Sequence, residues 1–277
     1  MKKSFAVCLA LLGTILISAN ASVYLSGFMG PENLVFDSKG VLYVTDTDHL
    51  WKVNPDKTLE KLYTRDQDAD STSLGGIVIS RDGSVIFSAG TRLLRLSPMG
   101  KISEYAKGFK FANGLAIDES DNIFVADSND KQILVVTPDQ KTSVLVKDQG
   151  AVNGLEYQQK TMRLYFTSMF SGKVGYVQLA PGLEVEKIVE VAKLGVGLDD
   201  MALDEDGTLY VCQYMKGKIF AISPDGKKEV LVEGIKGPSS VVAGKNEQNI
   251  KVLYILEKGD NMKFDGTSIL YVKVSRK

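Results

Sequence analysis

Four residues with oxygen-bearing side chains occupy one position of a repeated segment, and together they have the chemistry of a cation site. They are Glu32, Asn113, Asn153 and Asp199, each at the start of a short apolar run. Carboxylates and amide carbonyls bind hard cations, and this mixture suits Ca²⁺, which accepts about six to eight oxygens in flexible geometry. Because the position holds no histidine or cysteine, zinc is disfavoured. We predict a Ca²⁺ site, with another hard divalent cation as an alternative.

The repeated segment predicts the fold that brings these residues together. Apolar runs such as VLYVTD, NIFVAD and TLYVCQ recur after turn residues, which is typical of short strands. A period of about 40 residues with four strands per repeat indicates propeller blades. The sequence therefore predicts an all-β, six-bladed β-propeller with four-stranded blades. The repeats begin at Glu32, Gly75, Asn113, Asn153, Asp199 and Ser239.

The last repeat is short and offers three strands. We predict that SVYLSGF, near the N-terminus, supplies the missing outer strand. This pairing would close the ring and cover two sheet edges.

The first strand of a propeller blade lies nearest the axis, so the residue that begins it is expected to point into the channel. Two acids meeting there would repel each other without a cation. Asn-Gly is also a common turn dipeptide, so turn chemistry alone could explain Asn113 or Asn153. It does not explain Glu32 and Asp199.

Residues 1–21 predict a secretory signal peptide, with Lys2 and Lys3, an apolar stretch and a final Ala-Asn-Ala. Residues 22–277 form one predicted domain. We expect an exported protein, periplasmic if the organism has two membranes and otherwise extracellular. The apolar stretch is short for a membrane span, and a net charge of −1 disfavours nucleic acid as a partner. Cys212 is expected to be a buried apolar residue.

The fragments GPENLVFD, FANGLAID, AVNGLEYQ and GLDDMALDEDGTLYV resemble the senescence-marker-protein/gluconolactonase/luciferin-regenerating-enzyme-like family. Its relatives include paraoxonase-type lactonases and diisopropylfluorophosphatase. The resemblance covers the whole mature chain and implies a propeller with a catalytic Ca²⁺ in the channel. It makes Glu32, Asn113, Asn153 and Asp199 the metal ligands, with Asp200 as a possible fifth.

Two residues depart from the family pattern. Sugar-lactonase members commonly have an arginine where this chain has Phe111, which argues against gluconolactone-type sugar specificity. His49 is the single histidine, so the two-histidine relay of the paraoxonase-like branch is excluded.

The resemblance implies a small-molecule lactone or ester as substrate, and the sequence leaves a phosphotriester open as an alternative. Ca²⁺ would act as a Lewis acid, and Asp199 would act as base or nucleophile, two roles that the sequence does not separate. The second strands return to the channel mouth, where an apolar wall would suit an alkyl or aryl substrate; packing beneath loops is the alternative. The candidate substrate-binding residues are His49, Asp127, Met169, Phe170, Tyr214 and Met215.

Two other functions fit the sequence. A non-enzymatic propeller similar to NHL repeats could bind a protein or glycan, with any metal purely structural. A strictosidine-synthase-like condensing or lyase activity shares the predicted fold, but this ligand set is not expected in it.

Overall fold

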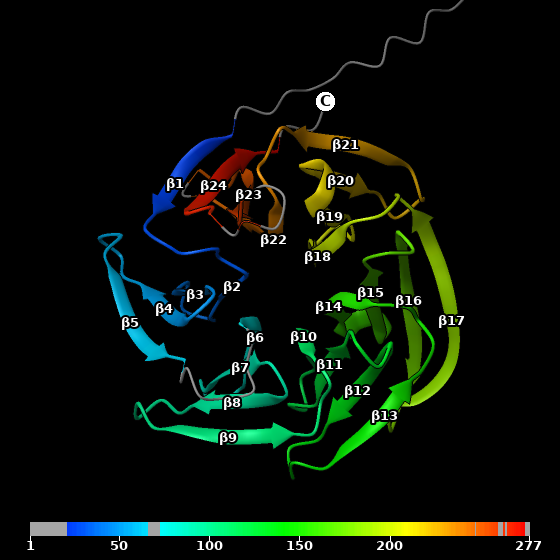
Figure 1. The fold of residues 1–277 in the computed structure, drawn as a ribbon. Helices are drawn as coiled ribbons and strands as arrows, with labels where there is room; N and C mark the ends of the chain where they lie inside the picture. The colour runs from blue at the N-terminus through cyan, green and yellow to red at the C-terminus, as the bar shows by residue number, and fades with distance from the viewer. Residues whose placement is uncertain (1–20, 66–72, 247, 260–262, 264, 275–277) are drawn as a thin grey trace, which may run out of the picture.

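The computed structural model describes residues 21–65, 73–246, 248–259, 263 and 265–274. These residues form six four-stranded antiparallel sheets arranged around one axis (Figure 1), which confirms the predicted six-bladed β-propeller. The predicted signal peptide lies outside the described residues except for Ala21. No helix of the described chain has the length and apolar character needed to cross a membrane.

Five blades are each built from four consecutive strands. Blade one contains β2 (Asn33–Phe36), β3 (Leu42–Thr45), β4 (His49–Val53) and β5 (Leu59–Thr64). Blade two contains β6 (Leu74–Ile79), β7 (Val85–Ala89), β8 (Arg92–Leu96) and β9 (Ile102–Lys107). Blade three contains β10 (Ala112–Ile117), β11 (Ile123–Asp127), β12 (Gln132–Val136) and β13 (Thr142–Val146).

The next two blades each include a single turn of 3₁₀ helix. Blade four contains β14 (Val152–Gln158), η1 (Gln159–Thr161), β15 (Arg163–Ser168), β16 (Lys173–Ala180) and β17 (Glu184–Lys193). Blade five contains β18 (Leu198–Leu203), β19 (Leu209–Gln213), η2 (Tyr214–Lys216), β20 (Lys218–Ile222) and β21 (Lys228–Glu233).

The sixth blade joins the two ends of the chain. It contains β22 (Pro238–Lys245), β23 (Lys251–Glu257), β24 (Ser268–Lys273) and β1 (Ser22–Ser26). Strand β1 pairs antiparallel with β24, from Ser22 opposite Tyr271 to Ser26 opposite Ser268. The predicted closure by the N-terminal strand is therefore confirmed, and it leaves neither β24 nor the ring with an open edge at this point.

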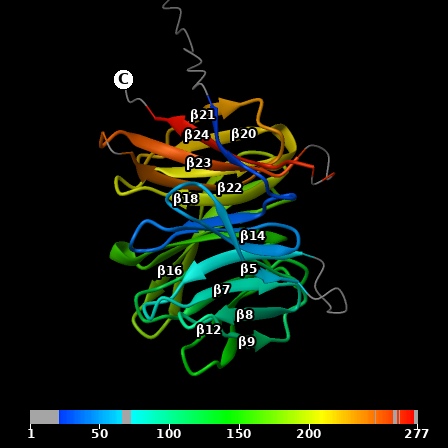
Figure 2. The same ribbon diagram turned by 90° about the vertical axis from the view of Figure 1, so that its left-hand side faces the viewer.

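The apolar core lies between neighbouring blades. Strands β7, β11 and β19 are buried along their whole length, which explains why their sequences are almost continuously apolar. Neighbouring sheets pack against each other around the ring, with an apolar cluster at each junction. Figure 2 shows the ring from the side. Cys212 lies in this core and is completely buried, as expected from the sequence.

Five of the six innermost strands share an irregularity at their first residues. In β6, β10, β14, β18 and β22 the pairing register shifts directly after the first residue. In β10, for example, Ala112 pairs with Asp127 and Leu115 with Val125, so Asn113 and Gly114 together oppose Ala126. Such a bulge turns a side chain out of the regular alternation.

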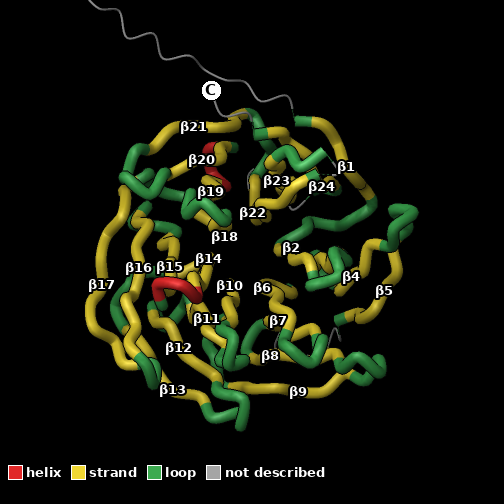
Figure 3. Tube along the Cα trace, turned by 180° about the vertical axis from the view of Figure 1, so that it is seen from behind, coloured by secondary structure: helices red, strands yellow, loops and turns green. Residues whose placement is uncertain are grey.

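Glycine is needed after Asn113 because the neighbouring blade packs closely there, not because the chain turns. Asn113 and Gly114 lie inside β10, one of the strands grouped around the axis (Figure 3). A Cβ on Gly114 would lie 2.2 Å from the Asn153 carbonyl oxygen of the next blade. The turn explanation of Asn-Gly therefore does not describe this position.

We predict that Gly114→Ala destabilises the protein by about 3 kcal/mol or more, because the rigid backbone of β14 must move to admit the methyl group. Denaturant unfolding of the two proteins measures the difference. The control is Gly244→Ala in β22, where the nearest atom lies 3.8 Å from the added Cβ. Equal stability of both variants would contradict the close-packing explanation.

Candidate functional site

The four predicted ligands line one cavity at the end of the channel where the inner strands begin. Glu32, Asn113, Asn153 and Asp199 come from four blades and share a cavity of about 300 Å³. Asn153 and Asp199 are buried, whereas Glu32 and Asn113 are partly exposed. The fold thus brings together side chains that are far apart in the sequence.

Buried hydroxyl groups fix the backbone at these positions, which the sequence reasoning missed. Ser88 Oγ donates to the carbonyl oxygen of Asn113 at 2.9 Å. Thr167 Oγ1 donates to the carbonyl oxygen of Asp199 at 2.5 Å and accepts from the Gly154 N–H at 2.8 Å. Each hydroxyl lies on the second strand of one blade and holds the first strand of the next. The ligand positions are therefore set by contacts between blades.

The cavity brings acidic side chains together where they are largely shielded from solvent. Burial raises the pKa of Asp199 well above its ordinary value, and the nearby Glu32 carboxylate raises it further. The Lys258 ammonium and a hydrogen bond from the Asn153 side chain act in the opposite direction and lower the pKa of Asp199. Positive charge beside this carboxyl group therefore favours its ionised form.

The donor set fits a hard divalent cation. It offers two carboxylates and two amide groups from four directions around the axis, and the two acids need positive charge between them. Among the described residues, no three His, Cys, Asp or Glu side chains form a group that could hold a metal by themselves. The amide oxygens of Asn113 and Asn153 are thus needed to complete the set.

Lys258 is a further residue of this cavity that the sequence did not single out. It lines the same cavity and forms an ion pair with Glu32, with both side chains largely buried. Lys258 follows Glu257, which pairs with the first residue of β22. Met169 and Tyr214 follow the equivalent residues of blades four and five and also line the cavity. This shared position was the available signal, but β22 (8 residues) and β23 (7 residues) are longer than β18 (6 residues) and β19 (5 residues), and the extra length hides it.

Asp200 lies apart from the other four predicted ligands. Its carboxylate accepts hydrogen bonds from Asn33 Nδ2 at 2.9 Å and Ser240 Oγ at 2.5 Å. It lines a separate pocket of about 900 Å³ at the opposite end of the inner strands. Burial raises the pKa of Asp200 to about 6, and these hydrogen bonds limit the rise. The structure therefore does not bring Asp200 into the cavity that Asp199 lines.

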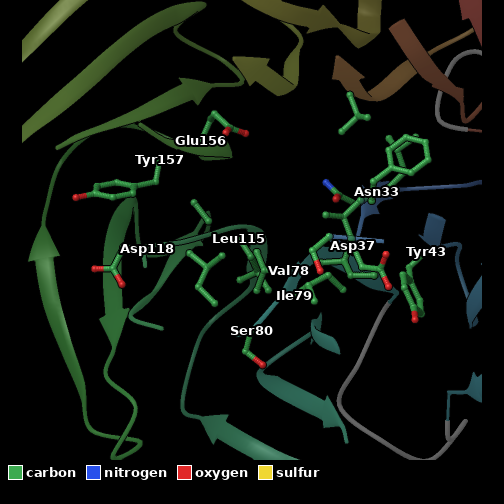
Figure 4. Close-up of a pocket in the computed structure, with 18 of the residues that line it drawn as sticks. Asn33, Asp37, Tyr43, Val78, Ile79, Ser80, Leu115, Asp118, Glu156 and Tyr157 are labelled. Atoms are coloured by element: carbon green, nitrogen blue, oxygen red, sulfur yellow. The ribbon is translucent and has the colours of Figure 1, made fainter. Parts of the chain in front are cut away.

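Glu156 shares the larger pocket with Asp200. Figure 4 shows the Glu156 carboxyl and the Asn33 amide pointing into this pocket from opposite walls. Part of the Glu156 side chain is exposed to the opening, but the surrounding blades enclose it. Burial, followed by the charge of Asp200, raises the pKa of Glu156 to about 8.

The predicted substrate wall is only partly assembled. Met169 and Tyr214 line the cavity together with Leu74 and Phe111. The Tyr214 hydroxyl donates to the Gly259 carbonyl oxygen at 2.9 Å, so its ring is held in place. The other predicted substrate-binding residues do not line the cavity; they are His49, Asp127, Phe170 and Met215.

The absent residues have other contacts or face solvent. His49 Nδ1 lies 3.1 Å from Asp46 Oδ1. Asp127 accepts hydrogen bonds from the backbone N–H groups of Lys110 and Phe111, so it positions Phe111 rather than lining the cavity itself. Phe170 and Met215 are exposed. Phe111, which departs from the family pattern, is part of the cavity wall.

Fold and site together define a six-bladed propeller with an acid and amide cluster at one end of its channel. Residues 25–256 match the family model of the SMP-30/gluconolactonase/LRE-like region. The chain belongs to this family. A search of curated proteins gave no match.

Solved structures share the fold at low sequence identity. A gluconolactonase from Xanthomonas campestris aligns with TM-score 0.73 and 13% identity over 93% of this chain and 90% of that chain. An auxiliary nutrient binding protein from Bacteroides thetaiotaomicron aligns with TM-score 0.75 and 13% identity, covering 92% and 76%. A virginiamycin B lyase from Staphylococcus aureus aligns with TM-score 0.63 and 18% identity, covering 94% and 89%.

The raised pKa of Glu156 predicts a pH dependence of stability. The folded state favours the neutral form of Glu156. Below the ordinary pKa of 4.5 the group is neutral in both the folded and the unfolded state, so it does not destabilise the fold. As pH rises from there to about 8, the unfolded state loses the proton more readily, and the free energy of unfolding falls. Glu156→Gln should remove this cost. Melting temperatures of variant and wild type should agree near pH 4 and diverge towards pH ~9, with the variant higher.

The control is Glu119→Gln, because Glu119 is an exposed acid on the wall of the same pocket. Its melting temperature should follow that of the wild type at every pH. A Glu156→Gln variant with the same pH profile as the wild type would contradict the assignment.

Proposed function

We propose that the protein is an exported, calcium-dependent hydrolase of lactones or related esters. The observation that carries the proposal is the convergence of Glu32, Asn113, Asn153 and Asp199 on one cavity. Membership of the SMP-30/gluconolactonase/LRE-like family supports a hydrolase of lactonase type at the level of the family. The predicted signal peptide supports export to the periplasm or the extracellular space.

The four side chains would hold Ca²⁺, with Glu32 and Asp199 neutralising its charge. When bound, the ion supplies a Lewis acid for the carbonyl oxygen of an ester or lactone. Asn153 orients the Asp199 carboxylate through its hydrogen bond. An Asp199 carboxylate oxygen would take a proton from the water that attacks the carbonyl carbon and pass it to the alcohol oxygen released when the acyl C–O bond breaks. Alternatively, it would attack the carbonyl carbon itself and displace that alcohol, and water would then hydrolyse the acyl-enzyme.

The cavity walls indicate the substrate class. Leu74, Phe111, Met169 and Tyr214 surround the cluster with mainly apolar surface. A volume of about 300 Å³ admits only a small molecule. We therefore favour a small aliphatic or aryl lactone or ester over a free sugar lactone.

A non-enzymatic binding propeller is the second candidate. The observation that favours it is the Lys258–Glu32 ion pair, which places an internal cation at the cluster. Since one solved propeller of this shape is an auxiliary nutrient binding protein, the fold also serves binding. In this alternative the protein binds a protein or glycan, and any metal is structural.

We predict that Asp199→Asn lowers turnover about 100-fold or more, because the amide can neither accept a proton nor attack. The measurement is hydrolysis of a panel of aliphatic, aryl and sugar lactones and an aryl ester, before and after calcium chelation. Chelation should abolish turnover by the wild type, and added Ca²⁺ should restore it.

The control variant is Asp139→Asn, an exposed aspartate on the turn between β12 and β13. It should retain wild-type turnover. Undiminished hydrolysis by Asp199→Asn would refute the role of Asp199, and turnover that survives chelation would refute the calcium requirement. Calcium binding without hydrolysis of any panel member would favour the binding propeller.

A further inference from the structure

A lysine side chain lies against the acidic residues of the cavity. The Lys258 ammonium pairs with Glu32 Oε2, and the two side chains are 14% and 13% exposed. Asp199 lines the same cavity. The Lys258 ammonium therefore offsets the repulsion between two acids that face one cavity.

The backbone around Lys258 is held on both sides, so its place in the cavity is built into the fold. The Lys258 N–H donates to the Gly237 carbonyl oxygen at 3.0 Å, and the Lys258 carbonyl oxygen accepts from the Gly266 N–H at 2.9 Å. The next residue, Gly259, accepts the Tyr214 hydroxyl hydrogen bond. A Cβ on Gly237 would lie 2.2 Å from the Gly259 carbonyl oxygen, so this contact requires glycine.

Lys258 and a divalent cation would need the same carboxylate. Ca²⁺ ligands lie about 2.3–2.6 Å from the ion, so an ion bound by Glu32 would lie beside the ammonium that now pairs with it. Two cations at this distance in a largely buried site repel strongly. One of them must leave before the other binds Glu32.

We propose that Lys258 is an internal competitor of the metal, which neutralises Glu32 and Asp199 in the calcium-free protein and must swing away when Ca²⁺ binds. This inference rests on the calcium site of the proposed function and adds a residue that sets its affinity. In the calcium-free protein, Lys258 then offsets the repulsion between the two acids, so the fold needs no metal to do so. Wild-type affinity is expected to be weak, in the range of about 10⁻⁴–10⁻³ M found for extracellular calcium modules.

The test is calorimetric titration of Ca²⁺ into the purified wild type and Lys258→Met, a substitution that keeps side-chain length and removes the charge. Lys258→Met should bind Ca²⁺ about tenfold more tightly or better, a gain of about 1.4 kcal/mol. Its melting temperature should fall below that of the wild type in chelator and rise more than the wild type on addition of Ca²⁺. Lys258→Gln, which can still donate a hydrogen bond, should bind more tightly too, and it replaces Lys258→Met if that variant does not fold.

The matched control is Lys236→Met, because Lys236 is exposed and lies in the neighbouring loop. It should bind Ca²⁺ as the wild type does. Equal Ca²⁺ affinity of the wild type and the Lys258 variants would overturn the competition and leave the calcium site intact. Folded wild type and variants that all fail to bind Ca²⁺ would overturn both the competition and the calcium dependence of the proposed function.

Discussion

The close approach of the inner strands around the axis is the constraint on which the rest of the structure depends. A Cβ on Gly114 or Gly154 would lie within 2.6 Å of the backbone of the next blade. At these two positions the blades approach so closely that only glycine fits. A bulge at the same place turns the preceding asparagine towards the channel. The same packing that closes the ring therefore also assembles the side chains of the site.

Assembly of the site brings two acidic side chains close together, where they repel each other unless positive charge lies nearby. Glu32 and Asp199 meet in one cavity, where burial disfavours the charged form of Asp199. Lys258, from the sixth blade, supplies positive charge beside these acids, and a divalent cation could supply it equally well. Because propellers of this shape include a lactonase, a lyase and a binding protein, the fold alone does not decide the chemistry. The charge balance at this cluster is the feature that bears on function.

Much of this architecture was predictable because it repeats. Six similar segments fix strand length, blade number and the inner position of each first residue, and the short last repeat indicated closure by the N-terminal strand. Asp200 was not predictable in the same way. It follows Asp199 directly, yet its carboxylate accepts hydrogen bonds from Asn33 and Ser240 and lines the larger pocket instead. The bulge in β18 decides which of these two adjacent acids lines which cavity.

The sequence by itself determined the class of fold, the repeat and the four oxygen-bearing residues of the cavity, because each of these is encoded within one blade or by its period. Only the tertiary structure decided what surrounds those residues. Ser88 and Thr167 reach the ligand positions from neighbouring blades, and Lys258 reaches Glu32 across the closure of the ring. These contacts join residues remote in sequence, so no local pattern records them; they exist only once the ring has closed.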